Sequence, residues 1–168
     1  MRLKRNFFNR PTPQVAKELI GKVLVRRLAG ELIKARITET EAYCGQKDLA
    51  CHASKGLTPR TKIMFGPAGF TYVYLIYGMY YCLNIVTGRE GYPAAVLIRG
   101  VEDIRGPGKV CRDLRIDKSL NAVDISTSKE LWIEEGLEKI ESSQIKKGKR
   151  IGVDYAGKWK DKLWRFYL

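Results

Sequence analysis

The stretch Phe70–Asn84, FTYVYLIYGMYYCLN, decides the fold, and it holds a dense group of the nine tyrosines in the chain. In its first half the tyrosines alternate with apolar residues, so Tyr72 and Tyr74 share one face of an expected strand. Tyr77 and Gly78 follow as a tight turn, because glycine adopts backbone angles that other residues resist. A second aromatic strand comes next. The pattern predicts a β-hairpin with the Tyr77 side chain at its tip.

The segments on either side of this hairpin favour a mixed α/β chain. A helix is expected at residues 12–20, capped by its first residue, and alternating strands are expected at 22–28 and 32–38. The second of these runs directly into Glu39–Tyr43, ETEAY. Residues 94–100 are nearly all apolar, which is typical of a strand buried on both faces. Further expected elements are a helix that opens at 106–109, a short strand or turn near 131–133, a basic loop at 144–150 and a final strand in 162–168.

Length and composition indicate one globular domain, residues 1–168, with 45% hydrophobic residues and no run long enough to span a membrane. The basic N-terminal segment lacks the apolar region of a secretory signal. The four cysteines form no CxxC pair, and the chain has a single histidine, His52. Of all arrangements only Cys44, Cys51 and His52 suggest a metal site, and an unusual one. We therefore expect an intracellular, reduced protein with no metal and no cofactor.

The net charge is the most informative feature of the composition. Thirty-one Lys and Arg residues against eighteen Asp and Glu give a formal net charge of +13. Such a surface points to a polyanionic partner, with nucleic acid the first candidate. A membrane surface is the second, although no basic amphipathic helix supports it. The charge could also serve solubility alone.

Arg99 is out of place at the end of an apolar strand. A buried arginine needs a carboxylate or a carbonyl, and Glu41 or Glu39 would supply it, in an ion pair that is either structural or catalytic. With Arg99 beside it, Glu41 would stay ionised and could activate a water molecule. The alternative for Glu41 is a surface glutamate at a strand end, and the alternative for His52 is a polar loop residue.

Two basic groups could bind phosphate. Lys109 and Arg112 lie at the start of a helix after the Gly-Pro-Gly turn, which could equally be only a turn. Lys55, Arg60 and Lys62 form a second basic cluster. If the partner is DNA, a tyrosine at a hairpin tip can wedge into the duplex, and a tyrosine-walled pocket can stack on a displaced base. The alternative is a non-catalytic nucleic-acid-binding module that uses the same tyrosines as stacking platforms.

The chain resembles the 3-methyladenine (alkyladenine) DNA glycosylases. The matching segments follow in order from about residue 10 to the end: ETEAY (39–43), ACHAS with TPR (50–60), MF…YVYLIYGMYYCLN (64–84), VLIR (96–99), GPGKVC (106–111) and RIGVDYAGKW with the terminal RFY. The resemblance implies an α+β single domain with a curved antiparallel β-sheet, surrounding short helices and a protruding β-hairpin. It also implies removal of damaged bases from double-stranded DNA without a metal.

The resemblance carries roles over to matching residues. Glu41 would deprotonate the attacking water, Arg99 would help to hold that water, and the backbone carbonyl of Ile151 would be its third contact. Tyr77 would intercalate in place of the flipped nucleotide, and Met79 would support this wedge in the opposite strand.

The base pocket is implied in the same way. Tyr43, His52 and Tyr74 would enclose the base, Asn84 would guard its edge, and Leu97 would line the same pocket. No lysine matches a pocket position, so a Schiff-base lyase step is not expected. We expect a monomer. The sequence does not rank 3-methyladenine against 7-methylguanine, hypoxanthine or ethenoadenine.

Overall fold

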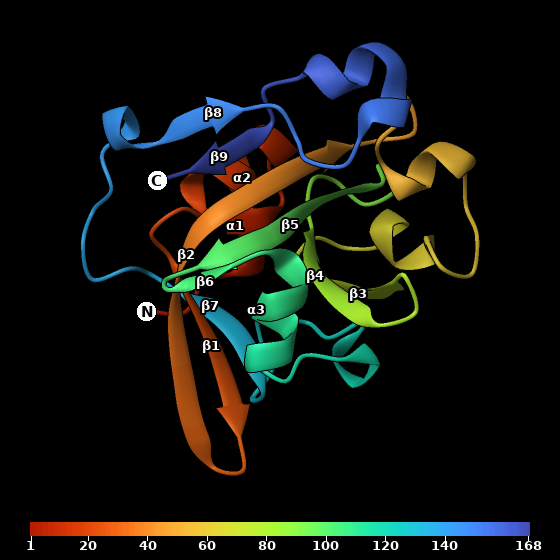
Figure 1. The fold of residues 1–168 in the computed structure, drawn as a ribbon. Helices are drawn as coiled ribbons and strands as arrows, with labels where there is room; N and C mark the ends of the chain where they lie inside the picture. The colour runs from red at the N-terminus through yellow and green to blue at the C-terminus, as the bar shows by residue number, and fades with distance from the viewer.

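A nine-stranded antiparallel sheet organises the chain, whose residues 1–168 are all described by a computed structural model (Figure 1). Its strands are β1 (Val23–Leu28), β2 (Glu31–Cys44), β3 (Thr71–Ile76), β4 (Tyr80–Val86), β5 (Ala94–Val101), β6 (Ile104–Arg105), β7 (Leu131–Glu134), β8 (Lys146–Gly148) and β9 (Arg165–Tyr167). The main path runs β3-β4-β5-β2-β1-β7. β6 pairs with β5, and β9 pairs with both β2 and β8.

Short helices surround this sheet, so the expected α+β fold with an antiparallel sheet is confirmed. They are α1 (Arg5–Phe8), α2 (Thr12–Glu18), α3 (Pro107–Asp113) and the 3-10 helices η1 (His52–Lys55), η2 (Lys62–Phe65), η3 (Lys118–Leu120), η4 (Ser142–Gln144) and η5 (Asp154–Asp161). None of them combines the length and the apolar character that a membrane crossing requires.

The long strand β2 joins the two parts of the sheet. Its first half pairs with β1 around a turn at Ala29 and Gly30, and its second half pairs with β5 and β9. The register against β5 shifts on both sides of Glu39, and such an irregularity bends a strand and increases its twist. The segment ETEAY therefore lies on a bent strand in the middle of the sheet (Figure 1). Successive side chains of a strand point to opposite faces of the sheet.

Strand β5 lies between β4 and β2, and every residue in it except Arg99 is buried. This confirms the strand that the apolar run at 94–100 predicts. One face of the sheet packs into a core of 25 buried residues that also includes side chains from α2 and α3. Ile37, Ile85 and Ile98 are fully buried there. The opposite face carries a second, smaller buried cluster that includes Tyr72, Val86 and Ala95.

Strands β3 and β4 form the predicted hairpin, and they pair in register from Thr71 opposite Ile85 to Ile76 opposite Tyr80. At its tip Tyr77 and Gly78 both adopt positive φ angles, 53° and 67°. The Tyr77 side chain is 86% exposed, as expected for a residue that projects from the tip.

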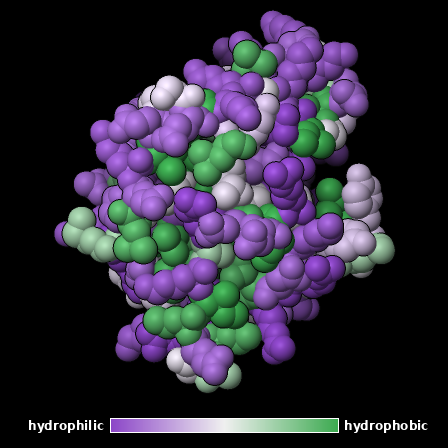
Figure 2. Space-filling model, turned by 60° about the vertical axis from the view of Figure 1, so that its left-hand side comes forward, coloured by the Kyte–Doolittle hydropathy of each residue, from purple (hydrophilic) through white to green (hydrophobic).

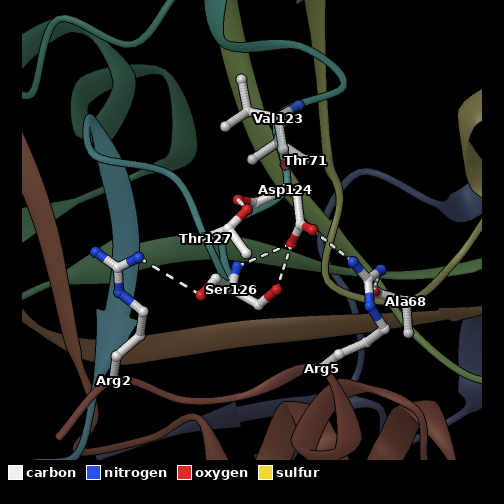
Figure 3. Close-up of polar contacts among 8 residues, drawn as sticks. All are labelled: Arg2, Arg5, Ala68, Thr71, Val123, Asp124, Ser126 and Thr127. Atoms are coloured by element: carbon white, nitrogen blue, oxygen red, sulfur yellow. Dashed lines mark hydrogen bonds and ion pairs between the residues drawn. The ribbon is translucent and has the colours of Figure 1, made fainter.

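An ion pair ties the N-terminal helix to the base of this hairpin (Figure 3). Arg5 on α1 donates to the Asp124 carboxylate at 2.5 Å and to the Ala68 carbonyl at 2.7 Å. Asp124 also accepts hydrogen bonds from the backbone and hydroxyl of Ser126. The adjacent backbone of Thr71, at the start of β3, donates to the Val123 carbonyl. The hairpin therefore rises from an anchored base.

Some boundaries differ from those that the sequence predicts. Thr12 is the first residue of α2 and does not cap it; its buried hydroxyl instead accepts a hydrogen bond from Thr87. Helix α3 starts at Pro107, two residues before Lys109, because proline fits the first turn of a helix. The expected basic loop at 144–150 contains β8, which pairs with β9.

Candidate active site

Four residues on neighbouring strands form a row of directly paired positions across the middle of the sheet. Glu41 on β2 lies opposite Leu97 on β5, Leu97 opposite Asn84 on β4, and Asn84 opposite Tyr72 on β3. Directly opposed residues in an antiparallel sheet project from the same face. The row thus gathers residues from three widely separated parts of the sequence on the face away from the main core.

A cavity of about 250 Å³ opens over this row. Thirteen of its eighteen lining residues are hydrophobic, and the remainder place a few polar groups against them, a composition typical of small-molecule sites. The sequence-predicted residues that line it are Tyr43, His52, Tyr74, Tyr77, Asn84, Leu97, Arg99 and Ile151.

Glu41 lies just behind the cavity wall and is 0% exposed. Its Oε2 accepts a 2.7 Å hydrogen bond from the Tyr43 hydroxyl, and its Oε1 accepts a 2.8 Å bond from the Ile151 backbone N–H. The Nε of Arg99 lies 3.7 Å from Oε1. Burial raises the pKa of Glu41, while Arg99, Tyr43 and the Ile151 amide oppose that rise. The result is a buried carboxylate held in one orientation by lining residues of the cavity.

Arg99 meets both carboxylates that the sequence suggests. It donates its hydrogen bond to Glu39 at 3.1 Å, and Glu39 also accepts a 3.1 Å bond from Arg165 on β9. The contact to Glu41 is the longer one. Because Glu39, Glu41 and Arg99 point to one side of the sheet, a carboxylate pair shares one guanidinium at the cavity wall.

The structure brings the Ile151 amide N–H, rather than its carbonyl, against Glu41. Ile151 follows β8 and is 48% exposed, so it forms part of the cavity rim. The carbonyl contact to water stays a prediction.

Aromatic rings form the opposite wall. His52 packs edge-to-face against Tyr74 with 4.5 Å between ring centroids, and its Nδ1 lies 2.9 Å from the Tyr72 hydroxyl. Burial, together with Arg60 and Lys55, lowers the pKa of His52 to about 4. His52 is therefore neutral at physiological pH. Its environment is that of a fixed pocket wall rather than of a solvated loop.

Ten lining residues are absent from the sequence-predicted site, and the two tyrosines among them are Tyr72 and Tyr155. Tyr72 is 3% exposed and accepts at its carbonyl a hydrogen bond from Asn84. Its alternation with Tyr74 was the signal that places it on the cavity face. Tyr155, at the start of η5, lines the cavity and is 70% exposed, and no pattern in the sequence marked it.

Of the hairpin tip and the predicted basic residues, Tyr77 lines the cavity and Arg60 contacts its wall, whereas Met79, Lys62, Lys109 and Arg112 do not line it. Met79, next to the tip, is 62% exposed. The Arg60 guanidinium lies 5.2 Å from the Tyr74 ring, and exposed Lys62 begins η2. Exposed Lys109 and Arg112 are on α3, where Arg112 pairs with its neighbour Asp113 at 2.6 Å.

Hydrophilic residues dominate the face of the molecule in Figure 2, with hydrophobic patches between them. Cys44, Cys51 and His52 do not assemble with other groups into a metal site: no three His, Cys, Asp or Glu side chains are placed to hold an ion.

A snug pocket that holds a base between aromatic side chains is typical of enzymes that act on a nucleotide removed from a duplex, and this cavity has Tyr43, Tyr72 and Tyr74 in its walls. The chain matches the family of methylpurine-DNA glycosylases over residues 6–106 and 102–168, and it belongs to that family.

Relatives across bacteria and archaea agree with this. A Legionella pneumophila (strain Lens) protein is 52% identical over 99% of this chain and 94% of its own length, and a Methanocella arvoryzae protein is 48% identical over 98% and 91%. A Desulfitobacterium hafniense protein is 46% identical over 99% and 95%. The names of all three assign them to the 3-methyladenine DNA glycosylases.

Proposed function

We propose that this protein is a monofunctional DNA glycosylase that hydrolyses the N-glycosidic bond of alkylated purines in double-stranded DNA. Deaminated and etheno purines are included in the proposal, since a cavity lined mainly by apolar and aromatic groups tolerates several purine shapes. The observation that carries it is the Glu41 carboxylate, held behind the wall of a base-sized cavity by Tyr43, Ile151 and Arg99.

The reaction begins with extrusion of the damaged nucleotide. Tyr77, exposed at the hairpin tip and lining the cavity, fills the space left in the duplex, and Met79 supports it from the other strand. The base enters between Tyr43 and the wall of His52 and Tyr74. Stacking on these rings offsets the cost of unpairing, which is lowest for damaged bases.

Glu41 then acts as the general base. Arg99 holds the water, the Ile151 carbonyl completes its contacts, and the water attacks the sugar carbon as the base departs. A carboxylate whose pKa is raised by burial is a stronger base toward water than an exposed one. Its negative charge also stabilises the oxocarbenium-like sugar of the transition state. None of the cavity-lining residues is a lysine, which supports simple hydrolysis without a strand-cleaving lyase step.

Base selection rests on the cavity edge. Asn84 is 4% exposed and fixed by its bond to the Tyr72 carbonyl, so its amide meets the edge of the entering base. Leu97 lines the floor beside it. Arg60, Lys62, Lys109 and Arg112 bind the phosphates around the extruded nucleotide. The protein works as a monomer inside the cell in this proposal.

The experiment compares the wild type with Glu41→Gln on duplexes that carry one hypoxanthine or ethenoadenine, and on methylated genomic DNA. Base release is read by chromatography and abasic sites by alkaline cleavage. We expect Glu41→Gln to lose roughly 10²- to 10⁴-fold in rate while binding persists, since a general base contributes that much. Glu31→Gln is the matched control, because Glu31 is an exposed glutamate at the start of the same strand.

Two outcomes would overturn the proposal. Binding without release of any base favours a stacking module that holds nucleic acid without chemistry. Strand breaks without alkali or heat would instead reveal a lyase step.

A further inference from the structure

A buried ion pair behind the cavity joins three segments of the active site. Asp48 and Arg150 have side chains that are both 0% exposed, and they contact each other through two hydrogen bonds, at 2.6 and 2.9 Å. Removing two charges from water carries a large desolvation cost, so such a pair contributes little net stability. What it does provide is a fixed geometry, because a bidentate arginine–carboxylate pair allows one orientation.

Arg150 reaches Tyr43 and Ile151 at the same time. Its guanidinium lies 4.9 Å from the centre of the Tyr43 ring and donates to the Ala42 carbonyl at 3.0 Å, so it contacts Tyr43 and the residue before it on β2. Arg150 also precedes Ile151 in the chain. Glu41 has two neutral donors, the Tyr43 hydroxyl and the Ile151 N–H. Arg150 therefore contacts the first of these residues with its side chain and is bonded to the second through the backbone.

Asp48 connects the same unit to the aromatic wall. Its carboxylate accepts hydrogen bonds from the backbone N–H groups of Cys44, at the end of β2, and of Ala50, two residues before His52. Arg150 donates a fourth hydrogen bond, to the Trp159 carbonyl at 3.0 Å, which ties η5 to the same ion pair. One ion pair thus fixes the strand with the proposed base, the loop that leads to His52 and the segment that follows β8.

We propose that Asp48 and Arg150 form a positioning unit that holds the Tyr43 hydroxyl and the Ile151 amide against the Glu41 carboxylate. Neither residue lines the cavity or touches the reacting atoms. The inference rests on the proposed function of Glu41 and adds to it the device that sets the orientation and basicity of that carboxylate.

The Arg5–Asp124 pair offers a matched control (Figure 3). Like Arg150, Arg5 donates both to an aspartate and to a backbone carbonyl, and it joins segments far apart in the sequence. It differs in lying away from the cavity and in being partly exposed. Arg150→Lys keeps the charge but removes the bidentate contact to Asp48. Arg5→Lys keeps the charge but removes the simultaneous contact to Asp124 and the Ala68 carbonyl.

The experiment measures single-turnover base release, its pH dependence and lesion-DNA affinity for the wild type, Arg150→Lys and Arg5→Lys, at a temperature where all are folded by circular dichroism. We expect Arg150→Lys to release base on the order of 100-fold more slowly, as misplaced catalytic groups do, with unchanged affinity. The acidic limb of its rate profile should move to higher pH, because Glu41 loses donors that favour its ionised form. Arg5→Lys should keep the wild-type rate and limb.

The other charged or titratable groups that face Glu41 stay in place in this comparison: they are Arg99 on β5, Glu39 on β2 and Cys82 on β4. If Arg150→Lys does not fold, Asp48→Asn combined with Arg150→Gln removes both charges and leaves no unpaired ion. An unchanged rate and pH limb in the folded variant would overturn the inference. Failure of the wild type to release any base would overturn the proposed function instead.

Discussion

The Nε of Arg99 donates a 3.1 Å hydrogen bond to Glu39, and it approaches the buried Glu41 only to 3.7 Å. Glu39 thus competes with Glu41 for the guanidinium. Its own negative charge also raises the pKa of Glu41. Because Glu39 is shared between Arg99 and Arg165, it determines how much positive charge the proposed base experiences.

Replacing Glu39 by glutamine should therefore make Glu41 easier to ionise. The substitution removes a neighbouring negative charge and frees Arg99 to pair with Glu41, and both changes lower the pKa of Glu41. We expect the acidic limb of the single-turnover rate to move to lower pH, which a pH series from 4 to 8 would measure. Glu102→Gln, which removes an exposed glutamate paired with Arg36, should leave the limb in place. A shift toward higher pH would contradict the interpretation.

Tyr77→Ala should separate nucleotide extrusion from chemistry. The side chain is 86% exposed, so its removal should change the free energy of unfolding by no more than about 0.5 kcal/mol. Base release from a duplex should slow, because nothing then fills the space of the flipped nucleotide, while release from a single strand should keep its rate. Tyr92→Ala, at an exposed tyrosine outside the cavity, serves as the control. Equal losses on both substrates would refute the wedge.

Lys109→Ala should weaken DNA binding without slowing the chemical step. An exposed lysine on α3 that neutralises one phosphate adds about one unit to the dependence of log affinity on log salt. We expect that slope to fall by about one, equally for damaged and undamaged duplexes, with an unchanged rate at saturating enzyme. Titrations at several salt concentrations would measure it. Lys34→Ala is the control, because Lys34 lies near the start of β2 and is paired with Glu134. This variant should keep the wild-type salt dependence.

The sequence predicts much of this arrangement because its strands alternate. The odd-numbered positions of ETEAY and VLIR place Glu41 and Leu97 on one face, and the tyrosine hairpin adds Tyr72 and Tyr74 to that face. Arg99 in an apolar strand predicts a nearby carboxylate, and in the structure both Glu39 and Glu41 lie beside it. These are local consequences of a period of two in β-strands.

What the sequence alone does not contain is the set of contacts between distant segments. The Asp48–Arg150 pair joins residues 102 positions apart, and Ile151 reaches Glu41 across 110. Neither Asp48 in a polar loop nor Arg150 at the end of a basic run differs from a solvated surface residue in its local pattern. The pairing of β9 with β2, together with the contacts of Arg150 and Ile151, brings the closing segment over the site. Tyr155 lies in the same closing segment, and its local sequence does not show that this segment folds back onto the cavity.

His52 should make the stability of the protein depend on pH. Its pKa is about 4 in the folded protein against 6.5 when unperturbed, so the unfolded chain binds an extra proton between these values. The stability contributed by neutral His52 is complete above pH 6.5 and is lost as the pH falls toward 4. In His52→Gln this loss is absent. The difference in unfolding free energy between the two proteins should therefore shrink on acidification, by at most about 1.4 kcal/mol per pH unit. Urea denaturation at pH 7, 6, 5 and 4 measures it, and a difference that stays constant would show that His52 titrates normally.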